Sequence, residues 1–189
     1  MQVKLNTNAE AESDEALMVR VREGDVLPLS ELFDRHGEKL FRYCWRMNQD
    51  RQLSEDLVQE GFCRVLRFRS SFRDGHSFQA WMYSIVRNLQ MDYWRKKRFE
   101  VEWEEGWDAP APASFPVEEK QEAALLHKAL GMLPPSKREI VVMARFQELR
   151  YEEIAEILGC ETVAARVRLH RALASLREIY LNLLKGSSQ

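Results

Sequence analysis

The sequence has few of the features that mark secreted or membrane proteins. Its 189 residues include 3 cysteines, which are Cys44, Cys63 and Cys160. Three widely spaced cysteines argue against a disulfide framework and fit a reducing compartment. No apolar run approaches the roughly 18 residues of a membrane-spanning helix, and residues 1–16 lack the apolar stretch of a secretion signal. We therefore expect a cytoplasmic protein.

Motifs for catalysis and metal binding are also missing. The histidines and cysteines do not have the spacing of zinc ligands. The chain contains no phosphate-binding glycine loop and no nucleophile motif. We expect no catalytic residue, no metal site and no cofactor.

Alternation of apolar and polar residues, the pattern of a half-buried strand, does not occur over any useful length. Apolar residues instead recur at helical spacing along most of the chain. This pattern predicts an all-α fold. Capping residues, glycines and prolines place the helices. They cover residues 14–23 after a Ser13 cap, a stretch after Pro28, a stretch capped by Ser54, residues 78–99 after a Ser77 cap, residues 117–132, and a stretch that starts with the capping-box pair Ser136 and Glu139.

An acidic segment with three prolines, "EVEWEEGWDAPAPASFPVEEK", interrupts the helices. Proline biases its neighbours toward extended backbone, so the segment is typical of a linker. We expect two small helical domains, residues 14–98 and 119–185, joined by a flexible linker over residues 99–118.

The stretch "YEEIAEILGCETVAARVRLHRALASLRE" predicts a helix-turn-helix, with Gly159 at the turn. A helical wheel places an apolar stripe from Leu169 to Leu183 on the inner side. The opposite side begins with small apolar residues, Val163 and Val167, which suit thymine methyl groups. Arginines on its flanks suit phosphates. A helical hairpin with solvated arginines is the alternative.

A second basic stretch, "RNLQMDYWRKKRF", ends the first expected domain. Cations that follow phosphates, together with rings that stack on bases, suit an unpaired nucleic-acid strand. The irregular stretch "RSSFRDGHS" before this helix could form a pocket for a base turned out of the duplex. The rings are equally explained by core packing, and the cations by a solvated helix end.

The stretch "SEDLVQEGFCRVLRF" has a different character. Its polar positions include Asp56, Gln59 and Glu60, and an acidic helix face suits a basic protein partner rather than DNA. The alternative is an ordinary amphipathic helix with one face in water.

Together these segments resemble the extracytoplasmic-function (group 4) sigma factors of bacterial RNA polymerase. "EDLVQEGFCRVLRF" is similar to their region 2.2, and "SFQAWMYSIVRNLQMDYWRKKRF" to regions 2.3 and 2.4. "LPPSKREIVVMARFQELRYEEIAEILGCETVAARVRLHRALASLR" is similar to region 4. The resemblance covers residues 14–98 and 119–184 in the family's order.

The resemblance implies a protein that binds core polymerase, through the β and β′ subunits, and gives it promoter specificity. It implies that region 2 melts the −10 element and captures a flipped base, that region 4 recognises the −35 element, and that an anti-sigma factor controls the protein. The implied polymerase contacts are Asp56, Gln59, Glu60 and Phe62. The implied −10 contacts are Phe72, Arg73, Asp74, Gly75, His76, Ser77, Asn88, Asp92, Arg95, Lys96, Lys97 and Arg98. The implied −35 contacts are Thr162, Val163, Arg166, Val167, Arg168, His170 and Arg171.

One stretch departs from the family's pattern. "CETVAARVRLHRA" stands where members often read "VPVGTVKSRLHRA", so the −35 preference of this chain is open. A second function also remains open, namely a two-domain helix-turn-helix regulator that binds duplex DNA without polymerase, as symmetric dimers usually do.

Overall fold

The computed structural model describes residues 12–101 and 121–186, and within these two stretches it contains eight α-helices, a single 3₁₀ turn and no strand. The helices are α1 (Asp14–Glu23), α2 (Pro28–Asn48), α3 (Arg51–Arg67), α4 (Phe78–Val101), α5 (Gln121–Met132), α6 (Pro135–Arg145), α7 (Tyr151–Leu158) and α8 (Thr162–Gly186), and the 3₁₀ turn η1 covers Arg69–Ser71. The predicted all-α fold is confirmed. None of the helices in the described stretches is long and apolar enough to span a membrane.

Two of the expected caps are present. The Ser13 hydroxyl accepts a hydrogen bond from the Ala16 N–H at the start of α1. The Ser77 hydroxyl accepts one from the Ala80 N–H at 3.2 Å at the start of α4. Helix α4 continues to Val101, three residues beyond the domain end expected at residue 98. The rest of the expected linker, residues 102–118, lies outside the described residues, as does the expected helical start at 117–120.

Two other expected caps are wrong. Helix α3 begins at Arg51 rather than after Ser54, because the Asp50 carboxylate caps it by accepting from the Leu53 N–H at 3.0 Å. Gln49, in the left-handed conformation with φ of 54°, turns the chain directly from α2 into α3. Helix α6 begins at Pro135 with no side-chain cap, so Glu139 is not part of a capping box.

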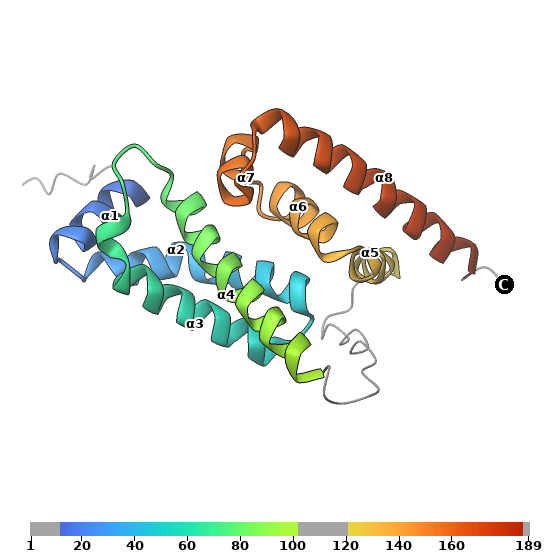
Figure 1. Cartoon of the computed structure of the whole chain (residues 1–189), viewed down its shortest axis with the longest axis horizontal. Helices are drawn as coiled ribbons and strands as arrows, with labels where there is room; N and C mark the ends of the chain where they lie inside the picture. The colour runs from blue at the N-terminus through green and yellow to red at the C-terminus, as the bar shows by residue number, and fades with distance from the viewer. Residues whose placement is uncertain (1–11, 102–120, 187–189) are drawn as a thin grey trace, which may run out of the picture.

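The first half of the chain is a bundle in which α3 packs between α2 and α4, and α1 lies across one end (Figure 1). Helices α3 and α4 approach closely at Gly61. A Cβ atom at this position would lie 2.8 Å from Cγ2 of Val86, which is closer than two carbon atoms can pack. This glycine therefore sets the distance between the two helices that carry the acidic and the basic stretches.

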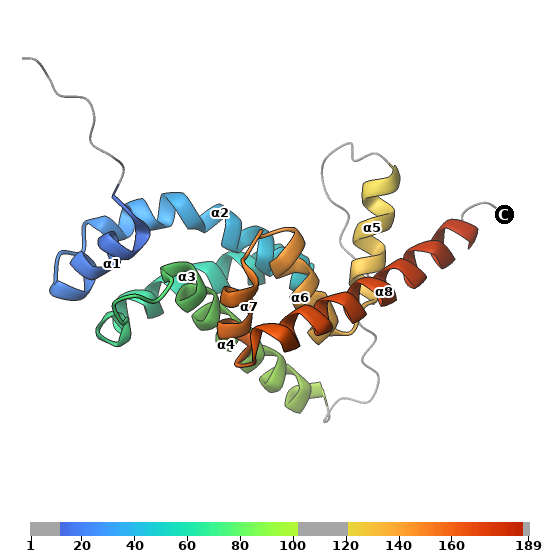
Figure 2. The same ribbon diagram turned by 90° about the horizontal axis from the view of Figure 1, so that it is seen from above.

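In the second half, α8 packs along α5, α6 and α7, and its C-terminal part extends beyond them (Figure 2). The buried side chains of α8 are Ala165, Leu169, Ala172 and Leu176. Leu173, Tyr180 and Leu183 are half-buried and pack against the same core, so the expected inner stripe is confirmed but is fully buried only in its first part. Helix α7 buries Ile154, Ala155 and Ile157 on the same core.

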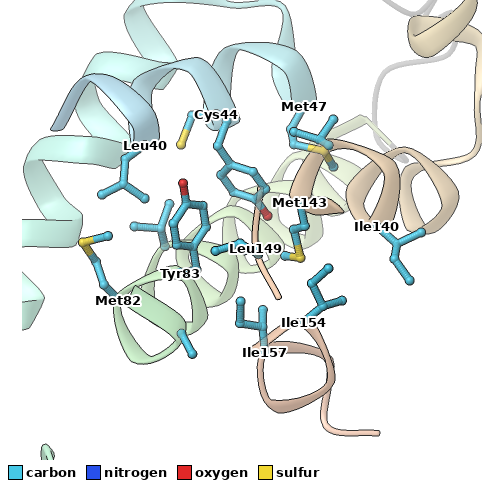
Figure 3. Packing of buried hydrophobic residues seen from close by; sticks show 14 of the residues in the cluster. Leu40, Cys44, Met47, Met82, Tyr83, Ile140, Met143, Leu149, Ile154 and Ile157 are labelled. Carbon is cyan, nitrogen blue, oxygen red and sulfur yellow. The ribbon is translucent and has the colours of Figure 1, made fainter. Parts of the chain in front are cut away.

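The two halves share one apolar core. Helix α4 packs on α7, and α2 packs on α5 and α6. Figure 3 shows Leu40 and Cys44 of α2 and Tyr83 of α4 on one side, with Met143 and Leu149 on the other. All five side chains are buried. This contact between the two halves is not predicted by the sequence patterns.

Polar groups complete the contact between the halves. Glu139 of α6 is 3% exposed and accepts hydrogen bonds from Nε of Arg87 at 2.9 Å and from the Tyr43 hydroxyl at 3.3 Å. Burial raises the pKa of Glu139 above its ordinary value, and Arg87 and Tyr43 offset only part of this effect. The Tyr83 hydroxyl donates to Oε1 of Gln147 at 2.9 Å. These buried pairs fix the register of the two halves.

We expect Gly61→Ala to lower the free energy of unfolding by about 1–3 kcal/mol, because the new methyl group overpacks the contact with Val86. Urea denaturation measures the effect. Val86→Ala in the same chain should recover part of the loss.

Gly37→Ala provides a matched control for this substitution. The nearest atom to its Cβ would be in the Phe33 ring, at 3.4 Å, which is an ordinary contact with a partly exposed side chain. If Gly61→Ala and Gly37→Ala lowered the free energy of unfolding equally, the close contact between α3 and α4 at Gly61 would not explain the effect.

Candidate nucleic-acid interface

Helices α7 and α8 form the predicted helix-turn-helix. Gly159 ends α7 in the left-handed conformation, with φ of 60°, and its N–H reaches the carbonyls of Ala155 and Glu156. The turn is short because glycine adopts this conformation without a steric penalty. Helix α8 then begins at Thr162 and leaves its first turns on the surface.

The outer side of α8 has the composition that the wheel predicts. Val163 is 71% exposed and Val167 is 44% exposed, although both are apolar. Thr162 is half-buried at the start of the helix, and the remaining members of the predicted set are exposed: Arg166, Arg168, His170 and Arg171. Tyr151 of α7 supports one of them, since its ring centroid lies 5.1 Å from the guanidinium carbon of Arg166. An apolar tip between cations suits the floor of a major groove between two phosphate rows.

The loop from residue 72 to 77 lies between η1 and α4. Arg73, Asp74, Gly75 and His76 are exposed, and Gly75 has φ of 79°. Phe72 differs from the expectation, because it is only 2% exposed and its ring centroid lies 5.3 Å from that of Trp81. Phe72 therefore anchors the loop in the core and offers no surface to a nucleic acid.

Two carboxylates of α7 contact this loop from the other half of the chain. The Ser77 hydroxyl donates to Oε1 of Glu153 at 2.8 Å, and Nδ1 of His76 lies 3.1 Å from Oε1 of Glu156. The Glu153 carboxylate also accepts from the Arg150 backbone N–H at 2.9 Å. Burial alone would raise the pKa of Glu153, but hydrogen bonds from Arg150 and Ser77 hold this pKa below the ordinary 4.5.

The end of α4 carries the second expected basic group. Asn88, Arg95 and Lys96 are exposed, and Asp92 pairs with Arg95. The Lys97 ammonium lies 5.8 Å from the centroid of the Tyr93 ring. Arg98 belongs to α4, but its side chain lies outside the described residues. The C-terminal part of α4, the helix that follows the loop 72–77, thus carries a group of basic side chains with an aromatic ring beside them.

The expected polymerase contacts lie on α3. Asp56 and Gln59 are exposed and Glu60 is half-buried. Phe62 is a correction, since it is 6% exposed and packs edge-on against Phe33 at a centroid distance of 4.9 Å. Asp56 and Glu60 line one side of a groove whose other side is formed by Asp92, Arg95 and Lys96 of α4. Some of the expected polymerase contacts on α3 and some of the expected −10 contacts on α4 therefore line the same groove. Their positions in the sequence, more than 30 residues apart, do not indicate this proximity.

Both halves match models of one protein family. The first is sigma-70 region 2, over residues 32–100, and the second is sigma-70 region 4, over residues 123–176. The chain is a member of the sigma-70 family. Together the two matches cover most of the chain and confirm the resemblance found in the sequence.

Curated relatives place this sigma factor in the extracytoplasmic-function (ECF) group. The RNA polymerase sigma factor CarQ of Myxococcus xanthus is 32% identical over 86% of this chain and 94% of its own length. The ECF sigma factor SigW of Bacillus subtilis is 30% identical over 84% of this chain and 92% of its own length.

A solved structure of a sigma factor has a similar fold. The sigma factor RpoE of Bartonella quintana, determined in complex with the anti-sigma factor NepR, has a TM-score of 0.72 and 26% identity. The match covers 79% of this chain and 94% of that one.

Within residues 12–101 and 121–186, no group of His, Cys, Asp or Glu side chains is placed so that it could hold a metal ion.

We expect Glu153→Gln to destabilise the folded chain by about 1 kcal/mol at pH 7, because hydrogen bonds to a charged acceptor are weakened. The folded pKa of Glu153 is lowered, so the stability it contributes is fully present above pH 4.5 and is lost as the pH falls through the folded value. Urea unfolding of both proteins between pH 7 and low pH should therefore show the difference shrinking in acid. A difference that stays constant with pH would contradict an ionised Glu153 at this contact.

Proposed function

We propose that this sigma factor binds core RNA polymerase, through its β and β′ subunits, and directs initiation at specific promoters. The first half melts and recognises the −10 element, and the helix-turn-helix recognises the −35 element. The observation that carries the proposal is the presence on one chain of two separate exposed surfaces whose composition suits DNA. One is the exposed valine tip of α8 between arginines, and the other is the loop 72–77 with the basic end of α4.

We assign contacts with the polymerase and with DNA to those predicted side chains that reach the surface. Asp56, Gln59 and Glu60 bind the β′ subunit, and Phe62 supports them from the core. Residues 73–77, with Asn88, Asp92, Arg95, Lys96, Lys97 and Arg98, bind the −10 strand, and Phe72 anchors their loop. Thr162, Val163, Arg166, Val167, Arg168, His170 and Arg171 bind the −35 element.

The functional units are residues 14–98 and 119–185, with residues 99–118 as the linker, and the protein works in the cytoplasm beside the polymerase. Because the relative RpoE is bound by an anti-sigma factor in its solved structure, we propose an anti-sigma partner for this chain as well. In the arrangement described above, Ser77 and His76 are occupied by α7 carboxylates. The −10 loop is therefore free for a DNA strand only after the halves separate.

Run-off transcription with core polymerase tests the proposal. Start sites are first mapped across genomic DNA with the purified holoenzyme, and one promoter is then cloned. The expected result is a discrete transcript that depends on both the protein and the polymerase. Tight, sequence-specific binding to duplex DNA by the protein alone, without association with core polymerase, would favour the helix-turn-helix regulator instead.

We expect Arg171→Ala to reduce promoter output by about fivefold, since losing a contact worth about 1 kcal/mol weakens binding by that factor. Val163→Ala and Val167→Ala should instead change the base preference within the −35 element, because each removes apolar contact with a base edge. A panel of promoters with single −35 substitutions separates the two effects.

Lys185→Ala is the matched control. It removes one exposed cation from the same helix, far from the first turns. If the two valine variants kept the parent's −35 preference, and Arg171→Ala behaved like Lys185→Ala, α8 would not enter the groove by this face.

A further inference from the structure

Helix α1 lies outside the match to sigma-70 region 2, which begins at residue 32. It nevertheless contacts both η1 and α4, the elements on either side of the loop 72–77. Figure 1 shows α1 beside this loop at one end of the molecule. Two of its side chains, Arg22 and Glu15, make polar contacts there.

Arg22 holds the first part of the loop. Its Nη1 donates to the Phe72 carbonyl at 3.0 Å and lies 2.8 Å from Oδ1 of Asp74. The Arg22 side chain is three-quarters covered, whereas that of Asp74 is 74% exposed. A partly buried, always charged guanidinium therefore fixes the course of the backbone and neutralises a carboxylate that would repel phosphates.

Glu15 holds the end of the loop. Its Oε1 accepts a hydrogen bond from the Phe78 N–H at 3.1 Å, the first backbone donor of α4. Ser77 satisfies another donor of the same helix end, that of Ala80. The direction in which α4 leaves the loop is thus set by a carboxylate from α1.

Between these two attachments the loop has little support of its own. Residues 73–76 are exposed, and their internal backbone hydrogen bond, from the His76 N–H to the Arg73 carbonyl, is 3.3 Å long. A segment that becomes ordered only when it binds loses conformational entropy at that moment. Contacts that hold the segment in its bound shape beforehand reduce this cost and so improve affinity and selectivity.

We propose that Arg22 and Glu15 are positioning residues that shape the loop 72–77 for an unpaired −10 base. This inference rests on the function proposed above. Neither side chain needs to touch DNA, because each acts through Phe72, Asp74 or Phe78. Selectivity for the captured base then depends on a helix that precedes the family's region 2 match.

The test uses the full chain with core polymerase and a mapped promoter, in which each −10 position carries each of the four bases in turn. Arg22→Ala should reduce discrimination at one or two adjacent −10 positions at least fivefold. Discrimination at the −35 element and affinity for core polymerase should stay within twofold of the parent. Arg22→Lys should recover at least half of the lost discrimination, because an ammonium can donate to the same two oxygens.

Glu15 supplies a second, independent pair. Glu15→Ala should reduce −10 discrimination, whereas Glu15→Gln should keep it, because the amide oxygen still accepts from the Phe78 N–H. Arg20→Ala is the matched control, since Arg20 is on the same helix and pairs with Glu12 and Asp25, away from the loop.

Two results would overturn the inference. One is an equal loss of output by Arg22→Ala and Glu15→Ala on every promoter, which indicates general destabilisation. The other is discrimination unchanged from the parent. If the parent itself shows no dependence on the −10 sequence, the proposed function fails instead, so the two failures are distinguishable.

Discussion

The arrangement of the whole molecule depends on a buried carboxylate between its two halves. Glu139 comes from α6, and its partners Arg87 and Tyr43 come from α4 and α2. A buried charge is costly unless it is paired and hydrogen-bonded, so the pair specifies how the halves fit together more than it adds to stability. The apolar contacts around it supply the attraction, and the carboxylate selects one register among many.

Much of the fold could be predicted from local patterns, and the recognition helix shows why. The spacing of Leu169, Ala172 and Leu176 defines an inner side, so the outward position of Val163 and Val167 follows from helix geometry alone. Gly159 likewise marks a turn that needs a positive φ. These features depend only on residues close together in the sequence.

Features that depend on distant residues could not be predicted in this way. Ser136 and Glu139 have the spacing of a capping box, yet Glu139 forms an ion pair with Arg87, which lies in the other half. Phe62 and Phe72 sit within motifs assigned to binding, but the rings of Phe33 and Trp81 bury them. A motif identifies which segment is functional, whereas packing decides which of its side chains reach the surface.

The shared core has a consequence for any measurement of binding. A partner that engages only the separated halves must expose Tyr83, Met143 and Leu149 to water before it gains any contact. Its apparent dissociation constant is then the intrinsic value divided by the fraction of molecules that are already open. Substitutions of Tyr83, Met143 or Leu149, which are buried and belong to none of the proposed contact sets, will therefore change all such affinities by one common factor.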